Sequence, residues 1–297
     1  MSAYTYQSKN VRKTWLLIFL FVGLVSAVFY VIGAVNNTPI FAVIGLVISL
    51  VQALIAYYTG DKIALTVARA KEVSPQKAPE IHNLVENLSK VADIPKPKVH
   101  ISPDPSANAF ACGRDPEHAS ICLNQGILNL LDKNELEGVI AHELAHIKNR
   151  DILVMTVTMV LASVISFIAD IGFRTLFWGG GRSSRDSDDM KSPFILVIYV
   201  VTLILAPIVA TLIQFAVSRS RESLADATAV VFTRYPKGLM SALEKLYKNP
   251  TPTNHYSTAM NHFYIAPPKK SFGQKVSGWF SSHPPIEERI QKLKNLS

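Results

Sequence analysis

The chain has few charged residues and almost no cysteine. Of its 297 residues, only 18% are Asp, Glu, Lys or Arg, whereas a water-soluble globular protein carries about 25%. This deficit argues against an ordinary soluble protein and points to a membrane. Two cysteines, Cys112 and Cys122, are too few for a disulfide framework. We expect both to be reduced residues of a protein core.

The sequence also lacks a tract of Lys and Arg interleaved with aromatic residues, although its formal net charge is +8. That absence argues against a nucleic-acid partner. The basic residues instead flank apolar runs, as in proteins that contact anionic lipid. We therefore predict the lipid bilayer as a partner and no nucleic acid.

Two uncharged apolar runs near the N-terminus, Trp15–Val35 and Ile40–Tyr58, are each long enough to span a bilayer. The first is too long for the apolar region of a cleavable signal peptide, and no small-residue cleavage site precedes a polar segment. Basic residues flank the pair on both sides, whereas the turn between the runs carries none: Lys9, Arg12, Lys13, Lys62, Arg69 and Lys71. A transmembrane hairpin with both ends in the cytoplasm is predicted.

A second pair of apolar segments, Ile152–Trp178 and Pro193–Val217, follows later in the chain. We expect another transmembrane hairpin, with Asp170 at the far interface. Burial of both helices against the catalytic domain is the alternative. The fold class predicted is an α+β membrane protein with about four transmembrane helices. Its parts are a first hairpin, a catalytic part, a second hairpin and a further catalytic part: residues 1–59, 60–151, 152–217 and 218–297.

The segment between the hairpins has the composition of a soluble domain. An amphipathic helix beginning at Pro79 is followed by three short strands near residues 99–101, 109–112 and 120–123, which predict a small antiparallel sheet. Asp132 and Glu135 then have the spacing of a capping box, which predicts the start of the next helix.

That helix contains the pattern His142-Glu143-Leu144-Ala145-His146. Two histidines four residues apart lie on one helix face, so both imidazoles can reach a single ion. Glu143 lies beside that face, where it can act as a base on the attacking water. The alternative is a chance match on an amphipathic helix, so a third ligand is needed to support a metal site.

The segment Ser218–Asp226 offers that ligand. A catalytic zinc ion has three protein ligands and one open position. Glu222 and Asp226 are four residues apart on one helix face. Glu222 can bind the metal, and Asp226 can accept a hydrogen bond from the outer nitrogen of a ligating histidine. Alternatively, this is a charged helix end at the membrane, with Arg219 and Arg221 touching headgroups; the nearby histidine pair favours the metal site.

These motifs resemble the HtpX membrane metalloproteases, a bacterial family related to the eukaryotic CAAX prenyl endopeptidase. The resemblance begins at the metal helix and its continuation Lys148-Asn149-Arg150-Asp151. Three further segments are similar to the family's third-ligand motif, substrate-strand motif and C-terminal H-P-P-x-x-x-R element: Ser218–Asp226, Asn108–Ala111 and Ser282–Arg289. One departure is Ser223, which stands where the family usually has an aromatic residue.

The resemblance covers nearly the whole chain and implies a gluzincin-like, zinc-dependent endopeptidase with one Zn²⁺ per chain. It further implies a multi-pass protein of the bacterial cytoplasmic membrane, with the active site and both termini facing the cytoplasm. The implied substrates are misfolded or damaged membrane proteins and unfolded polypeptides. The residues alone support only a zinc hydrolase held at a membrane surface.

The expected roles divide into metal binding, proton transfer and substrate binding. His142, His146 and Glu222 hold zinc, and Glu143 transfers the proton. His283 is a candidate for stabilising the oxyanion, with helix capping before Pro284 as the alternative. Three residues are expected to contact substrate at a sheet edge: Asn108, Ala109 and Phe110. Arg289 is expected to form a structural salt bridge.

Two other functions compete with this interpretation of the sequence. A membrane-anchored binding or chaperone protein would use its metal structurally, but structural zinc sites are usually closed and rich in cysteine. CAAX-type processing would restrict cleavage to C-terminal prenylated cysteine motifs. The resemblance is nearer to the bacterial quality-control proteases.

Overall fold

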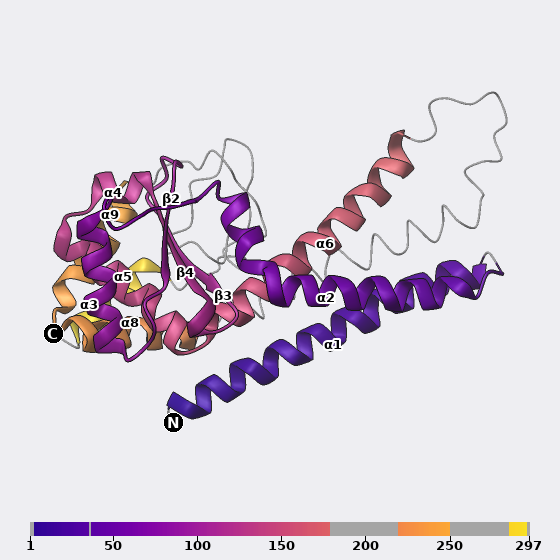
Figure 1. Ribbon diagram of the computed structural model, residues 1–297, viewed down its shortest axis with the longest axis horizontal. Helices are drawn as coiled ribbons and strands as arrows, with labels where there is room; N and C mark the ends of the chain where they lie inside the picture. The colour runs from indigo at the N-terminus through magenta and orange to yellow at the C-terminus, as the bar shows by residue number, and fades with distance from the viewer. Residues whose placement is uncertain (1–2, 36, 179–218, 250–284, 296–297) are drawn as a thin grey trace.

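The computed structural model describes residues 3–35, 37–178, 219–249 and 285–295 (Figure 1). Its helices are α1 (Ala3–Val35), α2 (Ile40–Val67), α3 (Pro79–Ala92), α4 (Gln125–Leu130), α5 (Lys133–Lys148), α6 (Asp151–Trp178), α8 (Arg219–Thr233), α9 (Pro236–Lys248) and α10 (Ile286–Lys294). Its strands are β1 (Lys71–Glu72), β2 (Lys98–Ser102), β3 (Ala109–Gly113) and β4 (Ala119–Asn124). The protein is therefore helix-rich and α+β, as the sequence predicts.

Helices α1 and α2 pack side by side as a long hairpin that projects from the α+β domain (Figure 1). Both are long and apolar enough to cross a membrane, and only 22% of the most apolar part of each is buried. A core helix of a soluble protein would be mostly covered, so the exposed apolar surface fits contact with lipid. Both helices continue beyond their apolar runs, α1 starting at Ala3 and α2 ending at Val67.

Helix α6 packs against α1, α2 and β3. Its first half, from Asp151 to Ile165, is apolar and almost entirely buried. This half therefore joins the hairpin of α1 and α2 to the α+β domain. The predicted span at residues 193–217 lies outside the described residues.

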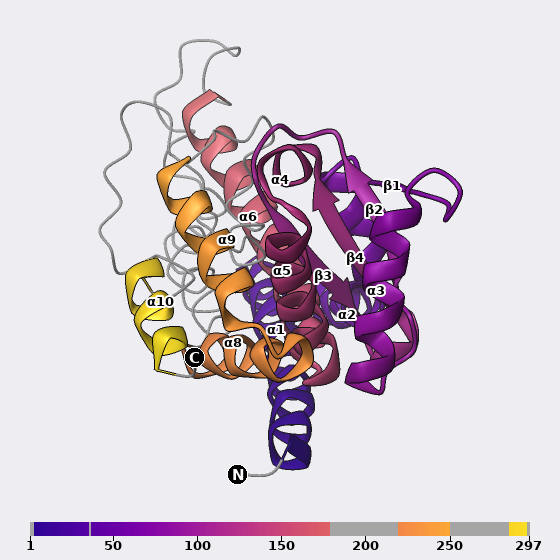
Figure 2. The same ribbon diagram turned by 90° about the vertical axis from the view of Figure 1, so that its left-hand side faces the viewer.

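The sheet has the strand order β1-β2-β4-β3 (Figure 2). Pairing is antiparallel between β1 and β2 and between β3 and β4, but parallel between β2 and β4. The prediction of an antiparallel sheet is therefore wrong, and the sheet is mixed. The reason is the position of β4, which forms a hairpin with β3 and then lies between β3 and β2, running in the same direction as β2. Among the described strands, β3 thus forms the sheet edge nearest to α5.

The two faces of the sheet contribute to two different cores. One face packs with α3, α5, α8 and α9 through residues such as Val99, Ile121 and Leu123. The other face presents Phe110, Cys112 and Cys122 to the cluster formed with α1, α2 and α6. Both cysteines are free and buried, which confirms the prediction of reduced core residues, and burial raises the pKa of each thiol.

Helix α5 lies between the sheet and helices α8 and α9 (Figure 2). It begins with the predicted capping box, in which Asp132 accepts from the backbone N–H of Glu135 and the Glu135 carboxylate accepts from that of Asp132. Glu135 also binds Ser241 at 2.6 Å and Lys245 at 2.7 Å on α9. These contacts hold the start of α5 against α9.

Glycine allows α5 and α9 to approach even more closely. A Cβ atom added to Gly138 would lie only 2.6 Å from the backbone nitrogen of Leu239. No larger residue fits there without a shift of one helix, since the obstacle is backbone. The metal helix is therefore held at a defined position one turn before His142.

Candidate metal centre

His142 and His146 lie one turn apart on the buried face of α5. Their rings meet edge to face, with centroids 4.7 Å apart. The two Nε2 atoms point to the same place and are separated by 3.2 Å. The i, i+4 spacing thus brings the two imidazoles together, as the helical period requires.

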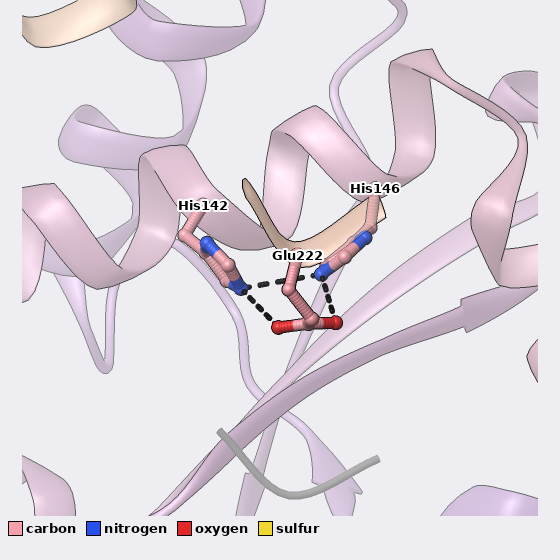
Figure 3. Close-up of side chains that lie close together, drawn as sticks. All are labelled: His142, His146 and Glu222. Atoms are coloured by element: carbon pink, nitrogen blue, oxygen red, sulfur yellow. Dashed lines mark hydrogen bonds and ion pairs between the residues drawn. The ribbon is translucent and has the colours of Figure 1, made fainter. Parts of the chain in front are cut away.

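Glu222 approaches the same point from α8, which packs against α5 (Figure 3). Its Oε2 atom lies 3.6 Å from His142 Nε2, and its Oε1 atom lies 3.6 Å from His146 Nε2. All three side chains are buried, and their ligand atoms lie within 4.8 Å of one another. Glu222, which is 76 positions after His146 in the chain, therefore forms one cluster of possible metal ligands with the two histidines.

The geometry of this cluster fits a metal ion of the zinc type. Tetrahedral ligands at zinc bond lengths of about 2.0–2.1 Å lie roughly 3.3–3.4 Å from each other. The two imidazole nitrogens are 3.2 Å apart, and each lies 3.6 Å from a different oxygen of the Glu222 carboxylate, so the separations are close to that value. Two imidazole nitrogens and one carboxylate also leave a coordination position open, as in catalytic zinc sites.

The charges buried around the cluster also favour a bound cation. Among the described residues, four buried carboxylates face two buried guanidinium groups here: Glu143, Asp151, Glu222 and Asp226 against Arg221 and Arg289. A charge excess of this kind is costly away from water unless it is compensated. A divalent cation between the ligands would balance it.

Each histidine is oriented by a carboxylate behind it. His142 Nδ1 lies 3.0 Å from Asp226 Oδ1, and His146 Nδ1 lies 2.9 Å from Asp151 Oδ2. When the outer nitrogen of each ring donates to its carboxylate, Nε2 is left as the acceptor facing the ligand cluster. The structure thus places Asp226 directly behind His142.

The contact of Asp151 with His146 is not predicted from the sequence, although Asp151 ends the motif that continues the metal helix. It lies five residues after His146, across a break between α5 and α6 at which Arg150 takes a φ of 56°. No helical period links the two positions, so spacing alone could not pair them. The available signal was an acidic residue at the start of the apolar helix that follows the metal helix.

Arg289 is fully buried, and it donates to both oxygens of Asp226. The distances are 2.9 Å from Nε and 2.7 Å from Nη2, the paired geometry that guanidinium and carboxylate groups favour. Although burial alone would raise the pKa of Asp226, Arg289 and His142 lower it below its usual range. Arg289 therefore keeps Asp226 ionised behind His142.

The structure does not fit the alternative in which Arg221 touches lipid headgroups. It is buried rather than available to lipid headgroups, and its Nε lies 3.7 Å from Asp151 Oδ1. Ser223, the departure from the family pattern, accepts a hydrogen bond from Lys292 of α10 at 3.1 Å. Small and polar, Ser223 thus contributes a link between α8 and α10.

The proton affinities of the site follow from burial and charge. Burial would lower the pKa of His142, but hydrogen bonds to Asp226 and Glu222 raise it to about 9. Burial raises the pKa of Glu143, against the opposing influence of His142 and His146. A carboxylate with a raised pKa next to the ligands is suited to accept and return a proton.

The predicted substrate residues lie at and just before β3. The backbone oxygen of Asn108 accepts from Asn124 at 2.9 Å, and Ala109 and Phe110 are buried. Phe110 packs in the cluster with Cys112 and Cys122, so its side chain is used for packing. His283 lies outside the described residues.

Together, the buried His-His-Glu cluster, the neighbouring Glu143 and the exposed apolar hairpin define a membrane metallopeptidase. The model of the family described as Peptidase family M48 matches residues 75–297, and the chain belongs to this family. It is therefore a membrane metalloprotease, which acts on peptide bonds with a metal cofactor.

Relatives named "Protease HtpX homolog" match the chain over almost its whole length. The one from Caldanaerobacter subterraneus subsp. tengcongensis is 46% identical over 296 residues, covering 99% of this chain and 98% of that relative. Those from Thermoanaerobacter pseudethanolicus and Streptococcus gordonii are 42% and 40% identical, covering 99% and 97% of this chain and 98% and 97% of each relative. This confirms the resemblance found in the sequence.

A solved structure shares the fold. The crystal structure of S. mikatae Ste24p aligns with a TM-score of 0.52 at 19% identity, covering 98% of this chain and 67% of that chain. At this identity the likeness concerns the fold alone.

Proposed function

We propose that the protein is a zinc-dependent endopeptidase of the bacterial cytoplasmic membrane that cleaves misfolded, damaged or unfolded membrane proteins. The observation that carries this proposal is the convergence of His142, His146 and Glu222 on one point, with Glu143 buried beside them. Membership of a metalloprotease family and the relatives' name support it.

The ligand residues would be His142, His146 and Glu222, and the bound Zn²⁺, one per chain, would acidify water and polarise the peptide carbonyl. Asp226 would hold His142 in the correct tautomer. Glu143 would accept the proton of the attacking water and deliver it to the leaving amine.

Substrate would bind as an extended segment along the edge formed by β3. Backbone groups at a sheet edge can pair with an added strand whatever its side chains, which suits a protease for unfolded polypeptides. Asn108, Ala109 and Phe110 would contribute the substrate contacts, while the side chain of Phe110 is used in packing. His283 would stabilise the oxyanion.

The proposed topology has four transmembrane helices, with the active site and both termini in the cytoplasm. The basic residues around the apolar runs support it. So does the contact of Asn10 with Asp151, since Asn10 precedes the first apolar run and Asp151 contacts the metal centre. The division into residues 1–59, 60–151, 152–217 and 218–297 stays part of this proposal.

The test compares purified wild type with Glu143→Gln in detergent. Zinc content and cleavage are measured on the same preparations, with casein and an unfolded membrane protein as substrates. We expect one zinc ion per chain in both proteins and at least a hundredfold loss of cleavage in the variant, since general acid–base groups typically contribute about 10²–10⁴-fold.

Glu137→Gln is the matched control, because Glu137 is a half-buried residue of the same helix outside the ligand cluster. It should retain both zinc and cleavage. Full cleavage by Glu143→Gln would refute the catalytic assignment. Zinc in both proteins with cleavage of neither substrate by wild type would favour a structural metal.

A further inference from the structure

The polar segment that precedes the first apolar run contacts the end of the metal helix. The last carbonyls of a helix lack partners within the helix. Gln7 of α1 donates to the Lys148 carbonyl at 2.8 Å, and Asn10 donates to the Asn149 carbonyl at 3.0 Å. The C-terminal end of α5 is thus capped by side chains about 140 residues earlier in the chain.

Asn10 makes a second contact, which reaches toward the ligands. The side chain is 5% exposed, and its Nδ2 lies 2.7 Å from Asp151 Oδ1. The other oxygen of Asp151 lies 2.9 Å from His146 Nδ1. A carboxylate held at one oxygen cannot rotate freely, so Asn10 also restricts the oxygen that orients His146.

We propose that Asn10 is a positioning residue of the metal centre. It holds Asp151 in the orientation that directs His146 Nε2 toward the bound ion. Helix α1 therefore has two roles, as a membrane span and as part of the outer support of the metal site. This inference rests on the proposed role of His146 as a ligand.

The geometry distinguishes Asn10 from a residue that only attaches α1 to the domain. Gln7 lies one turn earlier in α1. Among the contacts described for Gln7, the hydrogen bond to the Lys148 carbonyl is its only one with α5. Asn10 contacts both a helix-end carbonyl and Asp151. Removing Gln7 therefore weakens the docking of α1 without removing the link to His146, whereas removing Asn10 breaks that link.

The experiment measures the affinity of the full-length protein in detergent for Zn²⁺, by competition with a chromophoric chelator. Loss of a direct outer-shell partner costs about 10–100-fold in metal affinity. Asn10 is one step further out, so Asn10→Ala should weaken Zn²⁺ binding about three- to tenfold. Gln7→Ala should keep the wild-type affinity. The visible absorption bands of the Co²⁺-substituted protein should change in Asn10→Ala and not in Gln7→Ala.

A double-mutant cycle with Asp151→Ala tests whether Asn10 acts through Asp151. Asp151→Ala alone should weaken Zn²⁺ binding, and adding Asn10→Ala should then cause no further loss. The proposal is wrong if Asn10→Ala binds Zn²⁺ as tightly as wild type, if Gln7→Ala and Asn10→Ala weaken it equally, or if Asn10→Ala has the same effect in both backgrounds.

His146→Ala separates this proposal from the function on which it rests. If that variant retains the wild-type affinity for Zn²⁺, the assignment of His146 as a ligand fails, and the role of Asn10 fails with it. If His146→Ala loses Zn²⁺ while Asn10→Ala retains it, the metal site stands and only the positioning role is refuted.

Discussion

At the scale of single residues, the main feature is a concentration of ionisable groups out of contact with water. Glu222, Asp226 and Arg289 are each buried, and Arg289 contacts Asp226 through two hydrogen bonds. Such groups are stable in an interior only when each has a partner. The arrangement therefore makes the metal centre sensitive to the loss of any one member.

Arg289→Met should destabilise the protein strongly. It keeps a side chain of similar length but leaves Asp226 as a buried carboxylate without its cation, a loss that typically costs about 3–5 kcal/mol. The thermal unfolding midpoint in detergent should fall. Lys292→Met is the control on the same helix, because Lys292 is exposed and its contacts lie at the surface. Equal midpoints for the two variants would contradict a structural role for Arg289.

At the scale of elements, α5 is held at both ends by partners distant in sequence. Its start is bound to α9 through Glu135, and its end is capped by α1. Between these two attachments, Gly138 allows close contact with α9. His142 and His146 are thus carried by a helix that is held at both ends and at Gly138.

The contribution of Glu135 should depend on pH. Burial would raise the pKa of its carboxyl group, but Lys245 and Ser241 lower it below the ordinary value of 4.5. A lowered folded-state pKa means that the carboxylate stabilises the fold fully above pH 4.5 and loses this effect as the pH falls through the folded-state pKa.

Glu135→Gln should therefore lower the unfolding midpoint at pH 7, through a loss of about 0.5–2 kcal/mol. The difference from wild type should shrink below pH 4.5. The variant Glu137→Gln is the control on the same helix, since the described residues show no ion pair for Glu137. A constant difference across the whole pH range would count against the charge of Glu135 as the cause.

At the scale of the whole molecule, the membrane helices and the catalytic domain share a continuous packed interior. Phe110, Cys112 and Cys122 of the sheet belong to the same apolar cluster as residues of α1, α2 and α6. The hairpin is therefore packed against the domain rather than attached to it by a flexible linker. This packing places the His-His-Glu cluster near the part of α1 that precedes its apolar run.

The proposed topology predicts which residues a membrane-impermeant thiol reagent can reach. Asn37→Cys in the turn between α1 and α2 should react in intact cells, whereas Ser8→Cys should react only after lysis. Both positions are exposed on the protein surface. The native thiols should give little background because Cys112 and Cys122 are buried. Labelling of Ser8→Cys in intact cells would contradict a cytoplasmic N-terminus.

Local features of this protein were predictable from the sequence because they depend on residues close together in the chain. The apolar runs, the i, i+4 spacing of His142 and His146 and the capping box at Asp132 are all of this kind. The pairing of Glu222 with Asp226 on one face follows from the same helical period. These features were enough to predict the family and the group of ligand candidates.

Only the tertiary structure decided which distant segments meet. The insertion of β4 between β2 and β3 made the sheet mixed, and the chain path brought Arg289 to Asp226 and Asn10 to Asp151. Local propensity and periodicity carry no information about such contacts, because they arise when whole elements pack to bury their apolar faces. The sequence by itself determined the candidate ligands and the apolar runs, while packing determined the residues that lie behind the candidate ligands.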